Sequence, residues 1–401
     1  MKTKCFLLLA AILSATLQTG VAADGNLSQL ATANNTFAFK LLKQLSAENK
    51  GGNIFVSPYS AATALQMAAN GAAGQTKKEM QTALETAWLT PAALNEAAKA
   101  AAAALSSTDS NLILTTANAL WYRQGAQIKP AYLDANQKVF ASAIKALDFG
   151  NAPAAEAEIN RWANDQTHGR IDGIANGMIT PYTDLILANA IYFKGKWEDP
   201  FEKSQTKDRP FHPAAGPEKN LPMMQMSKKF TYRQGSGYQA VRLPYMGGDL
   251  AMYVFLPDPG SSPAKLLEIM NGDKWQRVTV PGFSEHDGFL ALPKFKLENT
   301  LDLNTPLAAL GMTAAFNKQT ADFSAMFSDP HYISAVRQKA FVEVNEEGTE
   351  AAAVTMIAMT ASAIEMNRPK PFEMIVDRPF LFAIVDARSE MILFMGVVNE
   401  L

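Results

Sequence analysis

The chain has 401 residues, of which 48% are hydrophobic and 18% are charged, and its formal net charge is −2 at pH 7. Such a composition is typical of a globular protein with a large core. The nearly balanced charge excludes the generally basic surface that a nucleic-acid-binding protein presents.

The first 23 residues are typical of a secretory signal peptide. They have a positive start at Lys2 and Lys4, an apolar run over residues 6–17, and small residues up to a cleavage site after Ala23. The run is shorter than the roughly 20 residues that a membrane span needs. We therefore expect cleavage to leave an exported protein, periplasmic or secreted, with no membrane segment. Because the only cysteine is Cys5, the mature chain is expected to contain no disulfide and no reactive thiol.

Residues 24–401 read as one domain, because no linker-like tract and no internal repeat interrupts them. Helical patterns dominate the first part of the chain, and strand patterns dominate later, so we expect an α+β fold. Helices are predicted at 26–45, from Ser57-Pro58 onward, at 92–105 and at 154–164. Strands are predicted at 112–122, 185–193, 251–256, 289–297, 340–344, 380–385 and 391–398.

Motifs for catalysis, metal binding or cofactor binding are not recognisable in the sequence. No histidine has metal-ligand spacing, and there is no Gly-x-Ser-x-Gly turn and no phosphate-binding loop with a lysine. An enzyme stays open at this point, because folding can assemble a catalytic group from distant residues. The histidines are His168, His212, His286 and His331.

The segment 345–366 is unusual because it consists mostly of small and apolar residues. Its alanine and methionine content favours a buried helix. The alternative is an exposed loop that can become a strand, in which side chains alternate between two faces. Gly348 at its base would supply the backbone freedom for a turn. One face would carry only small side chains, and the other would begin with a charge: Thr349, Ala351, Ala353 and Thr355 on the first, Glu350, Ala352, Val354 and Met356 on the second.

A series of short motifs runs from a strand that leads into a helix to the two closing strands. Each motif alone is modest, but their order and spacing together resemble the serpin family of serine protease inhibitors. The resemblance covers almost the whole mature chain. The motifs are 53–60, 187–197, 200–201, 243–245, 255–257, 341–353, 378–380 and 394–396.

The resemblance implies a serpin fold with three β-sheets, eight or nine α-helices and an exposed reactive loop over about residues 346–368. It also implies a suicide mechanism, in which a serine protease attacks the loop and forms an acyl-enzyme. The cut loop then inserts as a new central strand of the main sheet and carries the protease across the molecule. The protease site is distorted before water can release the enzyme. No helix is basic enough to predict a heparin-type cofactor.

The hinge of the loop is expected at residues 346–355. Its small side chains are compatible with fast insertion, whereas bulky or charged hinge residues are typical of family members without inhibitory activity. The hinge residues are Glu346, Glu347, Gly348, Thr349, Glu350, Ala351, Ala352, Ala353, Val354 and Thr355.

The reactive bond is expected at Ser362–Ala363, from the family's usual distance to the hinge glycine. A register shorter by one residue gives Ala361–Ser362, and both bonds suit elastase-like or subtilisin-like proteases with shallow pockets. Arg368 would suit a trypsin-like protease, but it lengthens the inserted segment too far. Other neighbouring bonds stay open, including those at Met359 and Met366.

The resemblance also assigns residues to the region where the main sheet opens. Many relatives have a histidine where this chain has Gln338, which can both donate and accept hydrogen bonds. We therefore expect the polar network to persist without the pH sensitivity of that histidine. The sheet-opening residues are Ser57, Ser60, Asn189, Trp197 and Gln338, of which Trp197 matches the aromatic residue where the loop first enters.

The function expected from the sequence is therefore inhibition, not catalysis. The partner would be a serine protease held in a covalent acyl-enzyme complex, and the inhibitor would act as a monomer. A serpin-fold chaperone or carrier without inhibitory activity is the alternative.

Overall fold

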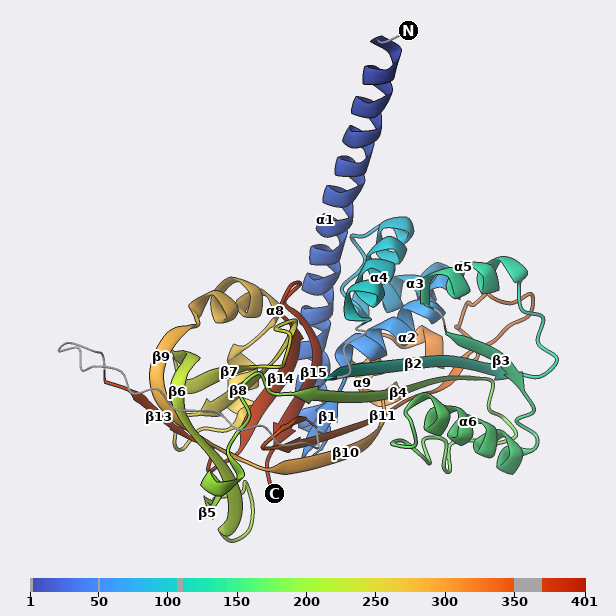
Figure 1. Cartoon of the computed structure of the whole chain (residues 1–401). Coiled ribbons are helices and arrows are strands. Elements are labelled where there is room, and N and C mark those ends of the chain that lie inside the picture. Colours follow the sequence, from blue (N-terminus) through green and yellow to red (C-terminus); the bar gives the residue numbers. More distant parts are fainter. Residues whose placement is uncertain (1–2, 50, 107–110, 141, 350–369) are drawn as a thin grey trace.

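The computed structural model describes residues 3–49, 51–106, 111–140, 142–349 and 370–401. Most helices precede residue 170, as the sequence predicts (Figure 1). In these residues the α-helices are α1 (Thr3–Glu48), α2 (Pro58–Gly71), α3 (Gly74–Ala83), α4 (Pro91–Leu105), α5 (Pro130–Phe140), α6 (Ala152–Gln166), α7 (Pro263–Ile269), α8 (Gly272–Lys274) and α9 (Asn304–Ala309).

Several helix starts follow from local capping chemistry. The Ser57 hydroxyl accepts a hydrogen bond from the Ser60 backbone N–H, and Pro58 occupies the first turn of α2. Thr90 caps α4 in the same way. Asn151 caps α6. The predicted helix at 26–45 lies within the longer α1, whose N-terminal part extends away from the body (Figure 1).

Six of the described strands form the main sheet, and its central strands are covered on both faces. Leu185 and Leu187 of β4 pack into the core beneath α2, whereas the alternate residues Ile186 and Ala188 pack against α6 on the opposite face. This two-sided burial explains the continuous apolar run in the sequence of β4. The sheet order is β10 (Phe295–Asp302), β11 (Ile333–Asn345), β12 (Gly348–Thr349), β4 (Leu185–Lys196), β2 (Leu112–Arg123) and β3 (Ala143–Leu147).

The other described strands form one nine-stranded sheet, although the resemblance implies two further sheets. The long strand β6 joins its two parts, because residues 223–232 pair with β9 and residues 231–235 pair with β7. Its path is β1 (Ile54–Val56), β15 (Met391–Val398), β14 (Phe380–Asp386), β8 (Leu250–Pro257), β7 (Tyr238–Pro244), β6 (Lys219–Gly235), β9 (Ser284–Pro293) and β13 (Phe372–Ile375), with β5 (Lys207–Phe211) beside β6.

The predicted strands are confirmed except at one position. The strand predicted at 289–297 is wrong, because Lys294 separates the end of β9 from the start of β10. The sequence also missed β6, in which exposed polar residues such as Lys229 are interspersed with buried ones such as Phe230.

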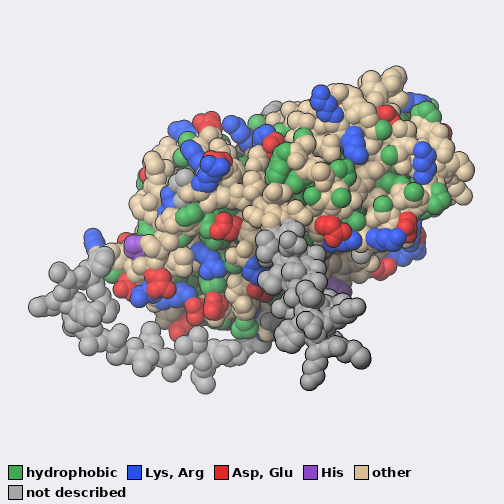
Figure 2. Space-filling view, turned by 90° about the horizontal axis from the view of Figure 1, so that it is seen from above, with side chains coloured by type: hydrophobic (Ala, Val, Ile, Leu, Met, Phe, Trp, Pro, Cys, Tyr) green, Lys and Arg blue, Asp and Glu red, His purple; other side chains and the backbone are tan. Residues whose placement is uncertain are grey.

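Charged side chains of both signs are interspersed over the face that Figure 2 shows. Within the described part of the chain, no helix is both long enough and apolar enough to cross a membrane.

Candidate functional site

The boundary between β11 and β4, called the seam here, is the centre of the candidate site. These two strands run parallel and pair directly with each other from Ile333 and Leu185 to Phe341 and Tyr192. Over this length the seam is closed, and no strand lies between them. Opening it would exchange one set of backbone hydrogen bonds for two sets made with an added strand.

At one end of the seam a short strand already separates its two neighbours. Gly348 of β12 faces Asn345 of β11 and Lys196 of β4, and Thr349 extends the same antiparallel pairing. A side chain at Gly348 would meet the Gly195 carbonyl oxygen at 2.1 Å, and its φ of +151° is one that residues with side chains rarely adopt. Only glycine therefore fits where the chain enters the seam.

Thr349 is fully buried beneath this end of the sheet. Its hydroxyl shares a 2.8 Å hydrogen bond with the hydroxyl of Tyr245, whose ring stacks on Trp197 with centroids 4.6 Å apart. Burial raises the pKa of Tyr245, although the bond with Thr349 lowers it in part, so the phenol stays neutral. The small Thr349 side chain thus fills a buried site between β12 and the rings of Tyr245 and Trp197.

The backbone of the turn before β12 is also held. The Trp197 indole donates to the Asn345 carbonyl and its backbone N–H donates to the Glu347 carbonyl, each at 3.0 Å. The Phe201 backbone N–H donates to the Glu346 carbonyl at 2.8 Å. Trp197 therefore anchors the turn before β12 in addition to packing in the core.

Glu346 and Glu347, the hinge carboxylates within the described residues, have cationic partners. Glu346 is buried, accepts from Thr206 at 2.9 Å and lies 3.0 Å from the ammonium of Lys294. Burial alone raises the pKa of Glu346, but hydrogen bonds from its own backbone and from these two partners outweigh burial and lower it. The carboxylate of Glu347 lies 2.5 Å from the exposed Lys203 ammonium.

A polar cluster spans the middle of the seam. Gln338 of β11 and Asn189 of β4 are paired in register, and the Gln338 amide donates to the Asn189 side-chain oxygen Oδ1 at 2.6 Å. Gln338 also accepts from the Ser57 N–H at 2.7 Å and donates to the Ser57 carbonyl at 2.9 Å. Asn189 donates to Ser60, and to Asn118 of β2 at 2.6 Å. The cluster fixes three strands to the start of α2.

The structure divides the predicted sheet-opening residues into two groups. Ser57, Ser60, Asn189 and Gln338 lie together in the middle of the seam, whereas Trp197 lies at the hinge end. Sequence reasoning missed some members of both groups. These are Asn118 in the middle, and Tyr245, Thr206 and Lys294 at the hinge. The hinge residues 350–355 and the bonds at 361–363 lie outside the described residues.

The parallel strands β11 and β4 pair directly except at one end, where the short strand β12 lies between them. A main sheet of this kind defines a class of proteins that can take up an added strand. The family described as "Serpin (serine protease inhibitor)" matches residues 32–401. The chain belongs to the serpin family. Inhibition of serine proteases, and not catalysis, is the general activity that this membership supports.

Known proteins are similar over nearly the whole chain. A leukocyte elastase inhibitor from Sus scrofa is 37% identical over 389 residues, which cover 93% of this chain and 100% of that protein. A serpin-like protein from Methanosarcina mazei is 35% identical and covers 92% and 87%. The crystal structure of the thermophilic serpin tengpin in the native state superposes with a TM-score of 0.85 at 29% identity, covering 92% and 94%.

Proposed function

We propose that this serpin is a suicide inhibitor of elastase-like or subtilisin-like serine proteases. The observation that carries the proposal is the position of Gly348 and Thr349, which already pair with β11 and β4 at one end of a closed seam. Further entry of the loop would continue a strand that has begun.

The two registers of β12 agree on where the next loop residues would lie. Continued along β11, the pairing places Thr355 opposite Gln338, and continued along β4 it places the same residue opposite Asn189. As far as Ala335 and Ile186 both neighbours give one answer, so a single strand can follow both edges to that point, beyond which the pairing of β11 with β4 is irregular. The small hydroxyl of Thr355 would arrive where the amides of the polar cluster now bond to each other.

In the proposed reaction the protease serine oxygen attacks the carbonyl carbon of Ser362. The peptide bond to Ala363 breaks, its nitrogen takes a proton, and an ester joins Ser362 to the protease. Insertion of the cut loop then competes with attack of water on that ester. The similarity to a protein named leukocyte elastase inhibitor supports a target protease with a shallow pocket.

The experiment is incubation with pancreatic elastase or subtilisin, followed by electrophoresis in detergent. We expect a covalent complex with the mass of the protease and the inhibitor less the released C-terminal peptide. Mass spectrometry should show that this peptide begins at Ala363. A peptide that begins at Ser362 would select the shorter register. If no serine protease formed a detergent-resistant complex, the proposed inhibition would be contradicted. The alternative of a chaperone or carrier would then remain.

A hinge variant tests insertion itself. Thr349→Arg brings a charge to a fully buried position beside Tyr245, so the hinge should be expelled and insertion slowed. We expect the protease to cleave this variant without being trapped. Thr82→Arg, on the exposed face of α3, is the matched control and should trap like the wild type.

We also propose that the inhibitor is exported after cleavage behind Ala23 and acts as a monomer. The charged and apolar pattern of residues 1–23 supports export. N-terminal sequencing of the mature protein and gel filtration of the purified inhibitor test these two statements.

A further inference from the structure

A second polar contact crosses the seam at the end opposite β12. Asp184 directly precedes β4, and His331 lies just before β11. The His331 Nδ1 atom lies 2.9 and 3.0 Å from the two carboxylate oxygens of Asp184. Both residues are buried, with 6% of the surface exposed for His331 and 8% for Asp184. The contact thus joins the two strands where each begins.

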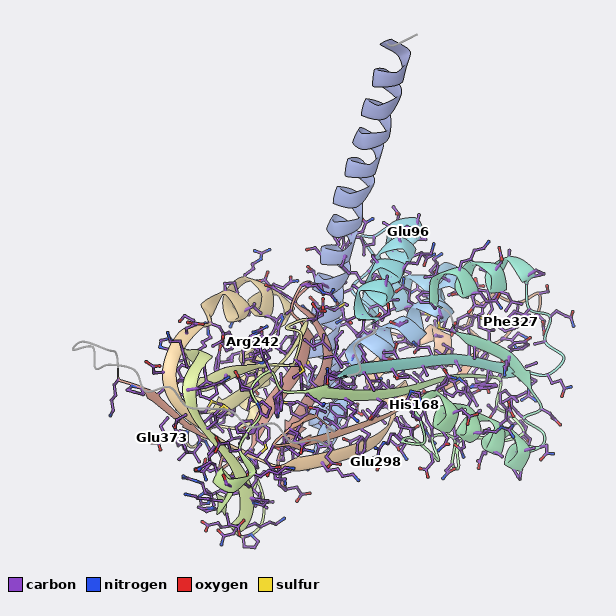
Figure 3. The ribbon with its side chains drawn as sticks, in the orientation of Figure 1. Glu96, His168, Arg242, Glu298, Phe327 and Glu373 are labelled. Carbon is purple, nitrogen blue, oxygen red and sulfur yellow. The ribbon has the colours of Figure 1, made fainter. Side chains whose placement is uncertain are left out.

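Backbone groups strengthen the same junction. The Tyr332 N–H donates to the Asp184 carboxylate at 2.9 Å, and the Asp184 N–H donates to the Ser334 hydroxyl at 2.8 Å. The His331 ring also packs on Phe327, with ring centroids 4.2 Å apart. Phe327 is labelled in Figure 3 on the side of the molecule where β2 ends and β4 begins.

We propose that the bridge between His331 and Asp184, called the clasp here, is the last barrier to complete insertion of the loop and makes trapping by this inhibitor pH dependent. The inference rests on the proposed insertion mechanism. It concerns the end of the seam opposite β12, which lies beyond the hinge and the polar cluster.

Geometry requires the clasp to open. Neighbouring strands lie about 4.8 Å apart, so an added strand doubles the spacing of β11 and β4. A 2.9 Å contact between His331 and Asp184 cannot survive that change. The registers of β12 would bring Thr360 opposite Asp184 and Ser362 opposite His331. The residue that carries the protease ester would therefore arrive at the clasp, so insertion is complete only after the clasp has parted.

Charge on the imidazole decides how strong the clasp is. Asp184 faces Nδ1, and Asp329 faces Nε2 at 3.0 Å. A neutral imidazole has one N–H and can donate to only one of these carboxylates, whereas the imidazolium donates to both. A further charged neighbour is Arg123 at the end of β2, whose Nε lies 3.6 Å from Asp184 on the β4 side of the seam.

These groups set the direction of the pH effect. Burial lowers the pKa of His331, but the hydrogen bonds and charges of Asp184 and Asp329 outweigh burial and raise it. The clasp is therefore at full strength below the ordinary histidine value of about 6.5, and it weakens as the pH rises through the raised value. Opening separates His331 from Asp184 and leaves Asp329 in place, so Asp184 supplies the pH dependence of opening.

The test uses a synthetic peptide with the sequence of residues 349–362, added to the intact protein without protease. Its rate of incorporation is followed on native gels between about pH 5.5 and about pH 8.5, the range in which a histidine titrates. We expect the wild-type rate to rise with pH. Asp184→Asn should insert about tenfold faster at the acid end, because a charge-assisted hydrogen bond is lost.

Three further variants separate the clasp from a general loss of stability. His331→Gln should abolish the pH dependence. Asp329→Asn keeps the contact across the seam and should move the midpoint of the profile to lower pH. His212→Gln removes an exposed histidine that pairs with Glu218 at 3.3 Å, and it should leave the profile unchanged.

The outcomes distinguish the clasp from the proposed function. A wild-type rate that is independent of pH, or clasp variants that insert at the wild-type rate, would overturn the clasp even while covalent complexes with protease still form. A peptide that enters no variant at any pH, with no covalent complex, would overturn the insertion mechanism and the clasp with it.

Discussion

Gln338 shows at the scale of one residue how the seam is held shut. A single amide satisfies the Ser57 N–H, the Ser57 carbonyl and the Asn189 side chain, all of them buried. A histidine has two ring nitrogens and could not make all three bonds at once. The substitution of glutamine at this position therefore preserves the network and removes its titration.

Removing this amide should destabilise the protein. Gln338→Leu leaves the buried Ser57 N–H and the Asn189 side-chain oxygen without partners, while the Ser57 carbonyl keeps the Ala61 N–H, so we expect the free energy of unfolding to fall by about 2–4 kcal/mol. Urea unfolding followed by circular dichroism measures the loss. Gln319→Leu, at an exposed position, is the control. Equal stability of the two variants would contradict the role given to Gln338.

Sequence reasoning reached Gln338, Asn189 and Ser57 through family motifs, but it could not find every partner. Asn118 sits beside Asn189 only because β2 and β4 pair in one particular register. His331 and Asp184 are 147 residues apart. No local pattern signals such contacts, because each depends on how distant strands align.

Among the elements, β12 is the smallest and the one on which the proposed function depends most. Gly348→Ala places a methyl group against the Gly195 carbonyl oxygen, so we expect the strand to leave the seam. The Trp197 N–H would then lose its bond to Glu347 and exchange with solvent about tenfold faster. Hydrogen exchange with mass spectrometry measures this change.

Gly125→Ala is the matched control for backbone strain. Gly125 has a φ of +96° but nothing within 4 Å of an added methyl group. It should cost similar stability and leave the exchange of Trp197 unchanged. If Gly348→Ala also left that exchange unchanged, the glycine requirement at β12 would be wrong.

The elements also show where patterns in the sequence are informative. β4 is buried on both faces, so its apolar run identifies a central strand. The boundary between β9 and β10 is different, because both sides of Lys294 carry strand-forming residues and only the change of pairing partner separates them. Hydrogen-bond partners far apart in the chain decide such boundaries.

For the whole molecule, the proposed function requires a fold held short of its most stable state. In the proposed mechanism the loop adds a strand between β11 and β4 once cleavage frees it from the closing strands. The gain is expected for the cleaved form, because the intact chain continues into β13 at the other end of the loop.

Cleavage in the loop should therefore raise the melting temperature of the inhibitor by about 20 °C, since each added hydrogen bond contributes about 1 kcal/mol. Thermal unfolding by circular dichroism before and after a catalytic amount of subtilisin measures the shift. Thr349→Arg should be cleaved without a comparable rise, because its hinge cannot enter the site beneath Tyr245. If cleaved and intact wild-type protein unfolded at the same temperature, the loop would not be the missing strand of the main sheet, and trapping by insertion would fail for this serpin.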